Sequence, residues 1–210
     1  MSAPDSGTGG AEVVLATSNP GKLAEIRRIL SGLPLAIRPL SDFPGLILPE
    51  EGADYEQNAI VKAQAASKFT GGVALADDSG LEVFGLGGAP GPLSARFGGP
   101  GLDDVGRVDA LLKAIVNLKG EQRRARFVCV AALATSEGDI VTARGEVAGH
   151  ILESPRGRKG FGYDPIFLVE GRDRAMAELP EPEKDRISHR AVAFTALSDA
   201  IHVQLRSAPS

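Results

Sequence analysis

Short apolar runs alternate along this chain with segments in which apolar residues recur at helical spacing. A short apolar run between polar or glycine-rich residues predicts a buried strand, and helical spacing predicts an amphipathic helix. Strands are expected at residues 12–16, 35–40, 73–76, 81–84, 125–136, 139–149 and 165–169. Helices are expected at residues 22–30, 54–69, 103–118 and 188–205. This alternation of elements favours an α/β fold.

Local signals mark several of these boundaries. Asp54 is placed to cap a helix, and Gln57 follows three residues later in the capping-box position. Ser188 is placed to cap the last helix. The segments 85–101 and 155–163 are rich in glycine and proline, so we expect both to be irregular.

Composition and charge exclude several classes of protein. The 210 residues carry a net charge of −4, so we expect no general nucleic-acid binding. The single cysteine, Cys129, lies in an apolar run, which excludes a disulfide framework and fits a reducing cytoplasm. No apolar stretch is long enough to cross a membrane. Residues 1–10 lack the apolar core of a signal peptide, so we expect a flexible tail before one domain at 11–210.

A polar turn from Thr17 to Lys22 joins the first expected strand to the first expected helix. Backbone N–H groups at a helix N-terminus favour a bound anion, and Lys22 adds a positive charge there. The turn is not a P-loop, because Ala16 stands where that motif needs glycine and Leu23 where it needs Ser or Thr. An anion site and an ordinary turn with a solvated lysine both fit this segment alone.

Two adjacent carboxylates, Asp77 and Asp78, follow the apolar run at 73–76 and precede Ser79 and Gly80. We expect a turn at the end of a strand here, because Asp, Ser and Gly are turn formers. Carboxylates crowded at such a turn would be stabilised by a hard divalent cation, although a solvated turn is the plain alternative. An aspartic protease would need a second Asp-Ser-Gly, and this chain has no other copy.

Further groups with binding chemistry are spread along the chain. Asn58 and Lys62 are four residues apart on one helix face, and Glu50 and Glu51 precede that helix. Two aromatics, an acid and several basic groups follow in the C-terminal part: Phe161, Gly162, Tyr163, Asp164, Lys184, His189 and Arg190. Each group alone also fits a solvated or packed side chain. Together they supply lysines for phosphates, carboxylates for a metal and aromatics for a base, which indicates a nucleoside triphosphate site.

Five blocks in this order resemble the inosine/xanthosine triphosphate pyrophosphatase family. The blocks are residues 17–22; 56–59 with 62–63; 76–81, continuing through 87–91 to 94–96; 160–165; and Lys184 with 187–190. The resemblance covers nearly the whole chain, from residue 13 to about residue 205. Gln57 stands where many members have Glu, and Ser18 where some have Gly; neither difference removes a group that the chemistry needs.

The resemblance implies an elongated α/β fold with a long central mixed sheet flanked by helices and an active-site cleft between two lobes. It implies a Mg²⁺-dependent homodimer that hydrolyses ITP, dITP or XTP to the monophosphate and pyrophosphate. The residues it places at the substrate are Thr17, Ser18, Asn19, Pro20, Gly21, Lys22, Lys62, Ser79, Phe161, Gly162, Tyr163, Asp164, Lys184, His189 and Arg190.

The same resemblance assigns Asp78 as the proton acceptor for the attacking water and as a metal ligand, two roles that the sequence cannot separate. Glu50 and Glu51 both fit as the glutamate that completes the metal site, and Glu50 is preferred. A nucleotide-sensing or RNA-binding module without catalysis is the alternative. The paired acids count against it, because a protein that only binds phosphates gains nothing from carboxylates there.

Overall fold

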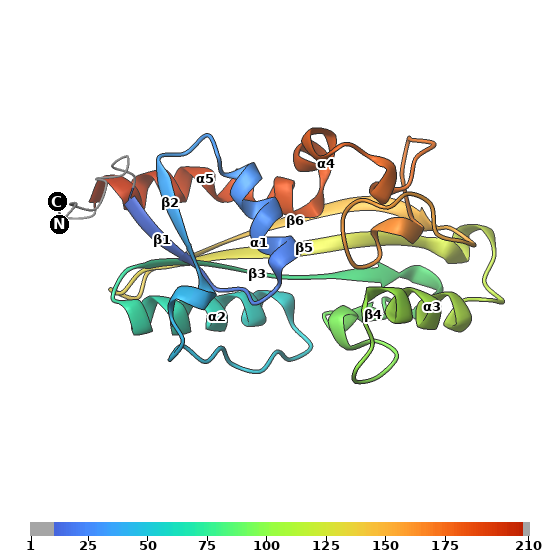
Figure 1. The fold of residues 1–210 in the computed structure, drawn as a ribbon, viewed down its shortest axis with the longest axis horizontal. Helices are drawn as coiled ribbons and strands as arrows, with labels where there is room; N and C mark the ends of the chain where they lie inside the picture. The colour runs from blue at the N-terminus through green and yellow to red at the C-terminus, as the bar shows by residue number, and fades with distance from the viewer. Residues whose placement is uncertain (1–10, 208–210) are drawn as a thin grey trace, which may run out of the picture.

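A mixed seven-stranded sheet forms the centre of the computed structural model, which describes residues 11–207 (Figure 1). The strands are β1 (Ala11–Leu15), β2 (Leu35–Pro39), β3 (Val73–Val83), β4 (Pro90–Gly91), β5 (Arg124–Ala134), β6 (Ile140–Ile151) and β7 (Phe167–Val169). Their order is β2-β1-β3-β5-β6-β7, with β4 paired to β3. The first three strands in this order are parallel, and every pairing after β3 is antiparallel. The predicted α/β fold with a mixed sheet is confirmed.

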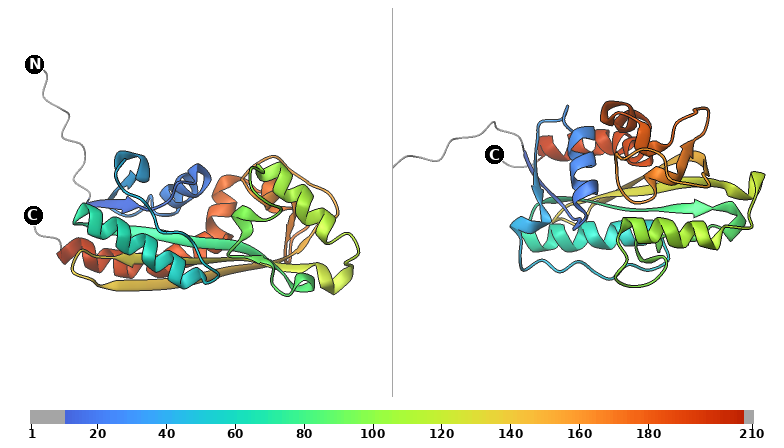
Figure 2. Two further views of the ribbon diagram at one scale, coloured as in Figure 1. Left: turned by 90° about the horizontal axis from the view of Figure 1, so that it is seen from below. Right: turned by 45° about the vertical axis from the view of Figure 1, so that its right-hand side comes forward.

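Helices cover both faces of the sheet (Figures 1 and 2). The helices are α1 (Pro20–Ile29), α2 (Tyr55–Thr70), α3 (Asp104–Ala114), α4 (Glu181–Ile187) and α5 (His189–Ser207). In Figure 1 and the right view of Figure 2, α2 and α3 lie on one face and α1, α4 and α5 on the other. Within residues 11–207, no helix is both long and apolar enough to cross a membrane.

The central strand β5 is buried on both faces, which explains its continuous apolar run. Val128 and Val130 pack in the cluster that contains the alanines of α2. Cys129 and Leu133 point the other way and pack in the cluster that contains α1 and α5. Successive strand residues point to opposite faces, so one uninterrupted apolar segment supplies the cores on both faces of the sheet.

The strand β3 differs from the prediction, because it does not end at Asp77. It continues to Val83 and pairs with β5 at every residue from Ala74 to Val83. The expected turn at Asp77-Asp78-Ser79-Gly80 is therefore wrong, and the two short strands expected around it are one long strand. The turn preference of these residues is overridden by the hydrogen bonds between β3 and β5, which satisfy their backbone groups. Gly80 is required by packing, since a Cβ there would lie 2.0 Å from the Gly91 carbonyl oxygen.

Several element boundaries also differ. The α4 helix was not predicted, and α3 ends at Ala114 rather than near residue 118. The first part of the strand expected at 165–169 is a 3₁₀ turn, Asp164–Ile166. The caps are confirmed: Asp54 accepts a hydrogen bond from the Gln57 N–H at 2.8 Å, and Ser188 accepts one from the Ala191 N–H at 3.1 Å. The predicted tail at residues 1–10 lies outside the described residues.

Close packing of α5 on β6 fixes the start of α5 against the sheet. A Cβ built on Gly145 of β6 would lie 2.2 Å from the His189 carbonyl oxygen and 2.5 Å from the Ala193 nitrogen. We expect Gly145→Ala to lower the free energy of unfolding by about 1–3 kcal/mol, because overpacking forces the helix away from the strand. Urea denaturation measures this change.

Gly32→Ala is the matched control for that substitution. A Cβ at Gly32 meets nothing within 4 Å, and its φ lies outside the left-handed region. We expect this variant to be as stable as the wild type or more stable by about 0.4–1 kcal/mol, since alanine restricts the unfolded chain. Equal urea midpoints for the two variants would contradict close packing at Gly145.

Candidate functional site

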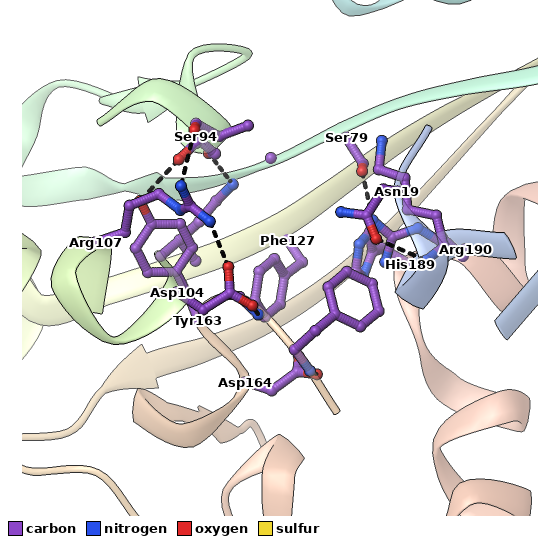
Figure 3. Close-up of a pocket in the computed structure, with 16 residues that line it drawn as sticks. Asn19, Ser79, Ser94, Asp104, Arg107, Phe127, Tyr163, Asp164, His189 and Arg190 are labelled. Atoms are coloured by element: carbon purple, nitrogen blue, oxygen red, sulfur yellow. Dashed lines mark hydrogen bonds and ion pairs between the residues drawn. The ribbon is translucent and has the colours of Figure 1, made fainter. Parts of the chain in front are cut away.

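Two adjoining pockets lie where β1 ends, α1 begins and β3 passes. The polar pocket is lined by Ala16, Thr17, Ser18, Asn19, Lys22, Leu48, Glu51, Lys62, Asp78, Ser79, Pro92 and Ala95. The aromatic pocket is lined by Asn19, Lys22, Ser79, Gly80, Leu81, Ser94, Ala95, Asp104, Arg107, Phe127, Phe161, Gly162, Tyr163, Asp164, His189 and Arg190 (Figure 3). Four residues line both pockets, so one elongated ligand can occupy them together: Asn19, Lys22, Ser79 and Ala95.

The turn before α1 is closed on itself by the side chain of Asn19. Its Oδ1 accepts hydrogen bonds from the Gly21 N–H at 2.8 Å and from the Lys22 N–H at 3.1 Å. The Thr17 hydroxyl accepts from the Asn19 N–H at 3.2 Å. Two N–H groups of the helix start are therefore already paired with Asn19. The polar side chains that face the pocket, Lys22 above all, are left as its main anion-binding groups.

Glycine at position 21 is explained by Phe161. A Cβ on Gly21 would lie 2.6 Å from the Phe161 ring carbon Cδ1, so a side chain here would push the ring away. The start of α1 and the 160–164 loop, which are far apart in the sequence, are thus in direct contact. Pro20 and Gly21 line neither pocket. Gly21 allows the close approach of the Phe161 ring, and Pro20 begins α1.

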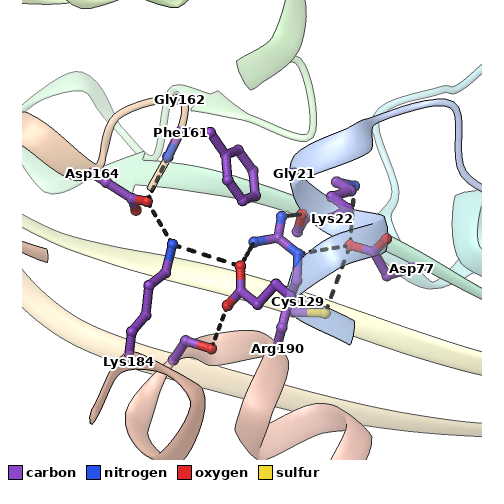
Figure 4. Close-up of polar contacts among 12 residues, drawn as sticks. Gly21, Lys22, Asp77, Cys129, Phe161, Gly162, Asp164, Lys184 and Arg190 are labelled. Carbon is purple, nitrogen blue, oxygen red and sulfur yellow. Dashed lines mark hydrogen bonds and ion pairs between the residues drawn. The ribbon is translucent and has the colours of Figure 1, made fainter. Parts of the chain in front are cut away.

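Asp77 and Asp78 point to opposite faces of β3, as successive strand residues must. Asp77 lies 3.0 Å from Lys22 Nζ and 3.4 Å from Arg190 Nε, on the side of α1 and α5 (Figure 4). Asp78 accepts a hydrogen bond from Asn58 Nδ2 of α2 at 2.8 Å. The two carboxylates therefore do not crowd each other, and that expectation is wrong because it assumed a turn.

Asp77 is completely buried and serves as a counter-ion. Burial alone would raise the pKa of its carboxyl group, but Lys22 and Arg190 outweigh burial and hold the pKa well below its usual range. The group is therefore ionised and unsuited to accept a proton. Asp77 lines neither pocket, so it acts on the site through Lys22 and Arg190.

Asp78 has the opposite character. Burial raises the pKa of its carboxyl group more than Lys62 and Asn58 lower it, and the carboxylate lines the polar pocket. Lys62 Nζ lies 3.5 Å from Asp78 Oδ1 and donates to the Asp77 carbonyl oxygen at 2.7 Å. A carboxylate with a raised pKa beside an anion-binding pocket is a suitable general base.

A metal site would have to use few protein ligands. Within residues 11–207, no group of three or more His, Cys, Asp or Glu residues could hold a metal ion. Mg²⁺ is commonly bound by one or two carboxylates, with phosphates and water completing its octahedron. Asp78 and one glutamate of the 50–51 pair fit that pattern. The hard oxygen donors of such a set suit Mg²⁺.

The two candidate glutamates differ in their contacts. Glu51 lines the polar pocket and is paired with Lys62 Nζ at 2.6 Å and Arg96 Nη2 at 3.6 Å. Glu50 is exposed and makes no ion pair with the described residues. A metal would compete with two cations for Glu51, whereas Glu50 lines neither pocket and would have to turn toward the polar pocket to bind a metal there.

The aromatic pocket combines ring faces with buried charge. Lys184 Nζ lies 4.9 Å and Arg190 Cζ 5.0 Å from the centroid of the Phe161 ring. Lys184 also forms a buried ion pair with Asp164 at 2.5 Å (Figure 4). Lys184 lines neither pocket itself, and it reaches the site through Phe161 and Asp164. Burial raises the pKa of Asp164 despite this pairing.

His189 is a neutral side chain on the wall of this pocket. Its ring stacks on Phe127 with centroids 4.8 Å apart and an interplanar angle of 12°. Burial first, and then the charges of Arg190 and Lys184, hold the pKa of His189 well below its usual range. Its Nδ1 atom is buried without a hydrogen-bond partner among the described residues. An unpaired buried polar atom is costly, so a polar ligand group at this position would be bound favourably.

Some residues of the aromatic pocket lie in the quoted sequence blocks but were not assigned to the site: Gly80, Leu81, Ser94 and Ala95. Asp104, Arg107 and Phe127 were not singled out from the sequence at all. Phe127 lies on β5 and alternates with Val128, so the strand period could have placed it on one face. The start of α3 carried no signal that it would meet the 160–164 loop. That contact depends on how the chain folds back in space.

Comparisons with known proteins agree on one family. The model of the Ham1 family matches residues 13–200. A dITP/XTP pyrophosphatase of Thermus thermophilus is 49% identical over 191 residues, which are 91% of this chain and 92% of that protein. The protein of the same name from Bacillus subtilis is 43% identical, over 89% of this chain and 95% of its own length. A HAM1 protein structure from Coxiella burnetii has a TM-score of 0.82 at 40% identity, covering 91% of this chain and 98% of its own. This chain therefore belongs to the Ham1 family.

Proposed function

We propose that the protein hydrolyses non-standard purine nucleoside triphosphates, namely ITP, dITP and XTP, to the nucleoside monophosphate and pyrophosphate. The observation that carries the proposal is the sharing of Asn19, Lys22 and Ser79 by two chemically different pockets. One pocket holds cations and a basic carboxylate, and the other holds aromatic faces and buried polar groups. A nucleotide needs one pocket for its phosphates and another for its base. The name of the relatives, dITP/XTP pyrophosphatase, agrees with this proposal.

In the proposed reaction, water attacks the α-phosphorus and the bond from that phosphorus to the bridging oxygen breaks. Pyrophosphate leaves, and the proton of the attacking water passes to Asp78. Without a bound metal, burial raises the pKa of Asp78, which favours proton uptake by this carboxylate. Lys22 and Lys62, with Thr17 and Ser18, bind the phosphates. Asp78 and Glu50 would hold Mg²⁺, which when bound neutralises charge on the phosphate oxygens.

The base would bind in the aromatic pocket, stacked on Phe161. Inosine and xanthosine carry a 6-oxo group, which accepts hydrogen bonds, where adenosine carries an amino donor. Arg190 supplies donors on the wall of this pocket, and neutral His189 offers an unpaired Nδ1. Lys184 adds a positive charge next to the Phe161 ring. A buried donor that faces the 6-amino group of adenine is left unpaired, which disfavours ATP. Asp164 fixes Lys184 in this arrangement.

The product and the role of Asp78 are tested together. Purified protein with Mg²⁺ and dITP should release pyrophosphate, and Asp78→Asn should lower kcat by about 10²–10⁴-fold because the proton acceptor is lost. Because Asp78 must be ionised to accept the proton, the wild-type kcat/KM should fall on acidification. A pyrophosphate-specific coupled assay across pH measures these quantities.

Asp199→Asn is the control for charge removal, because Asp199 is exposed on α5 and lines neither pocket. It should keep wild-type turnover. Orthophosphate as the sole direct product would mean attack at the γ-phosphorus and would refute the proposed reaction. Wild-type turnover by Asp78→Asn would remove Asp78 from the mechanism.

The metal ligands are tested with the adjacent glutamates as a matched pair. Glu50→Gln should raise the Mg²⁺ concentration for half-maximal activity about tenfold or more, because one of two carboxylate ligands is lost. Glu51→Gln should change it less, because Glu51 is already paired with Lys62. Mg²⁺ titrations of activity give both values. The reverse ranking would assign the ligand to Glu51.

Assembly and location are further parts of the proposal. We expect a homodimer, as the resemblance of the sequence implies, and sedimentation equilibrium should give twice the chain mass of 21.8 kDa. A mass equal to one chain at micromolar concentration would contradict the dimer. A cytoplasmic location is supported by the single thiol Cys129, which is buried and needs no oxidising compartment.

A further inference from the structure

The 160–164 loop, which carries Phe161, is held from two opposite sides. On one side, Asp164 accepts hydrogen bonds from the Phe161 N–H at 2.9 Å and from Lys184 at 2.5 Å. On the other side, the Gly162 N–H donates to Asp104 Oδ2 at 2.7 Å. Asp104 is the first residue of α3, which covers the opposite face of the sheet from α4 and α5. Asp104 and Gly162 both line the aromatic pocket, so this bond joins two parts of its wall.

The carboxylate of Asp104 is itself fixed by Arg107. Arg107 Nη2 lies 2.5 Å from Asp104 Oδ1, and Arg107 Nη1 donates to the Leu102 carbonyl oxygen at 2.5 Å and to the Ala95 carbonyl oxygen at 3.3 Å. The guanidinium thus connects the start of α3 to the backbone at positions 95 and 102. A charged acceptor held in this way makes a stronger and better directed hydrogen bond than a free one.

A second contact supports the same connection. The Tyr163 hydroxyl donates to the Ser94 carbonyl oxygen at 2.9 Å, and Tyr163 is buried. Gly162, between the two aromatic residues, has φ +60°, a conformation that favours glycine. Among the described residues, the loop makes two hydrogen bonds to the segment from Ser94 to Asp104. Without the bond to Asp104, only the bond from the Tyr163 hydroxyl to Ser94 would remain.

We propose that Asp104 is a positioning residue for base recognition, which anchors the loop through Gly162 and thereby holds the Phe161 ring where the base binds. This inference rests on the function proposed above, in which Phe161 stacks on the purine. Asp104 need not touch the reacting phosphates. Its loss should weaken binding of the base and leave the chemical step nearly unchanged.

Steady-state kinetics separate this role from catalysis. Asp104→Ala should raise KM for dITP about three- to tenfold while kcat stays within about twofold, as expected for loss of one half-exposed, charge-assisted hydrogen bond. Asp104→Asn keeps an acceptor for the Gly162 N–H and should recover most of the wild-type KM. An unchanged KM in Asp104→Ala, or an equal loss in kcat, would overturn the proposal.

Asp103→Ala controls for fraying of the helix. Asp103 caps α3 by accepting from the Gly106 N–H at 2.8 Å and makes no hydrogen bond to the loop. This variant should lower thermal stability yet leave KM for dITP unchanged. If it raises KM as much as Asp104→Ala does, the effect comes from the helix end and not from the bond to Gly162.

Tyrosine fluorescence tests, without substrate, whether Asp104 anchors the 160–164 loop. The chain has no Trp and two Tyr, so Tyr163 is the sole tyrosine in a Tyr55→Phe background. The Tyr55 hydroxyl has no hydrogen-bond partner among the described residues, so this background change should be mild. Asp104→Ala should increase acrylamide quenching of Tyr163 fluorescence, and Asp103→Ala should not. Equal quenching in both would refute the anchor, and absent pyrophosphate release by the wild type would refute only the proposed function.

Discussion

The carboxylate of Asp77, buried in the middle of β3, joins Lys22 of α1 to Arg190 of α5. Arg190 in turn contacts Glu25 at 3.3 Å and donates to Ser79 at 2.6 Å. Burying ions is costly, and their attraction compensates only when each has its partner. Removing Asp77 would leave two largely buried cations without this counter-ion. The orientation of the substrate-facing side chains thus depends on a residue that does not face the substrate.

The alternation of β3 separates this charge network from the reacting group. Asp77 faces the cations of α1 and α5, whereas Asp78, one residue on, faces Asn58 and Lys62 of α2. The pKa of the first carboxyl group is lowered and that of the second is raised, because the first has closer positive partners and the second is dominated by burial. Two adjacent aspartates on one strand can therefore act as counter-ion and as base.

The aromatic pocket obeys a different constraint, because its walls come from segments distant in sequence. Phe161 is confined by Gly21 of α1, by the cations Lys184 and Arg190, and by the Asp104 bond to Gly162. A ring held by several independent contacts is preorganised for stacking, which reduces the entropy that a ligand must lose. The unpaired Nδ1 of His189 is the polar feature that such a ligand would satisfy.

Patterns along the chain predicted the α/β fold and most strands and helices, whereas the mixed sheet and the side chains expected at the substrate came from the resemblance to the family. Apolar period and capping residues suffice for those elements because they act over a few neighbouring positions. The strand at Asp77-Asp78-Ser79-Gly80 could not be found in this way, since the ladder to β5 overrides the local turn preference of these residues. The hydrogen bond between Asp104 and the 160–164 loop also emerged only from the folded chain, because contacts between residues about sixty positions apart leave no periodic signal in the sequence.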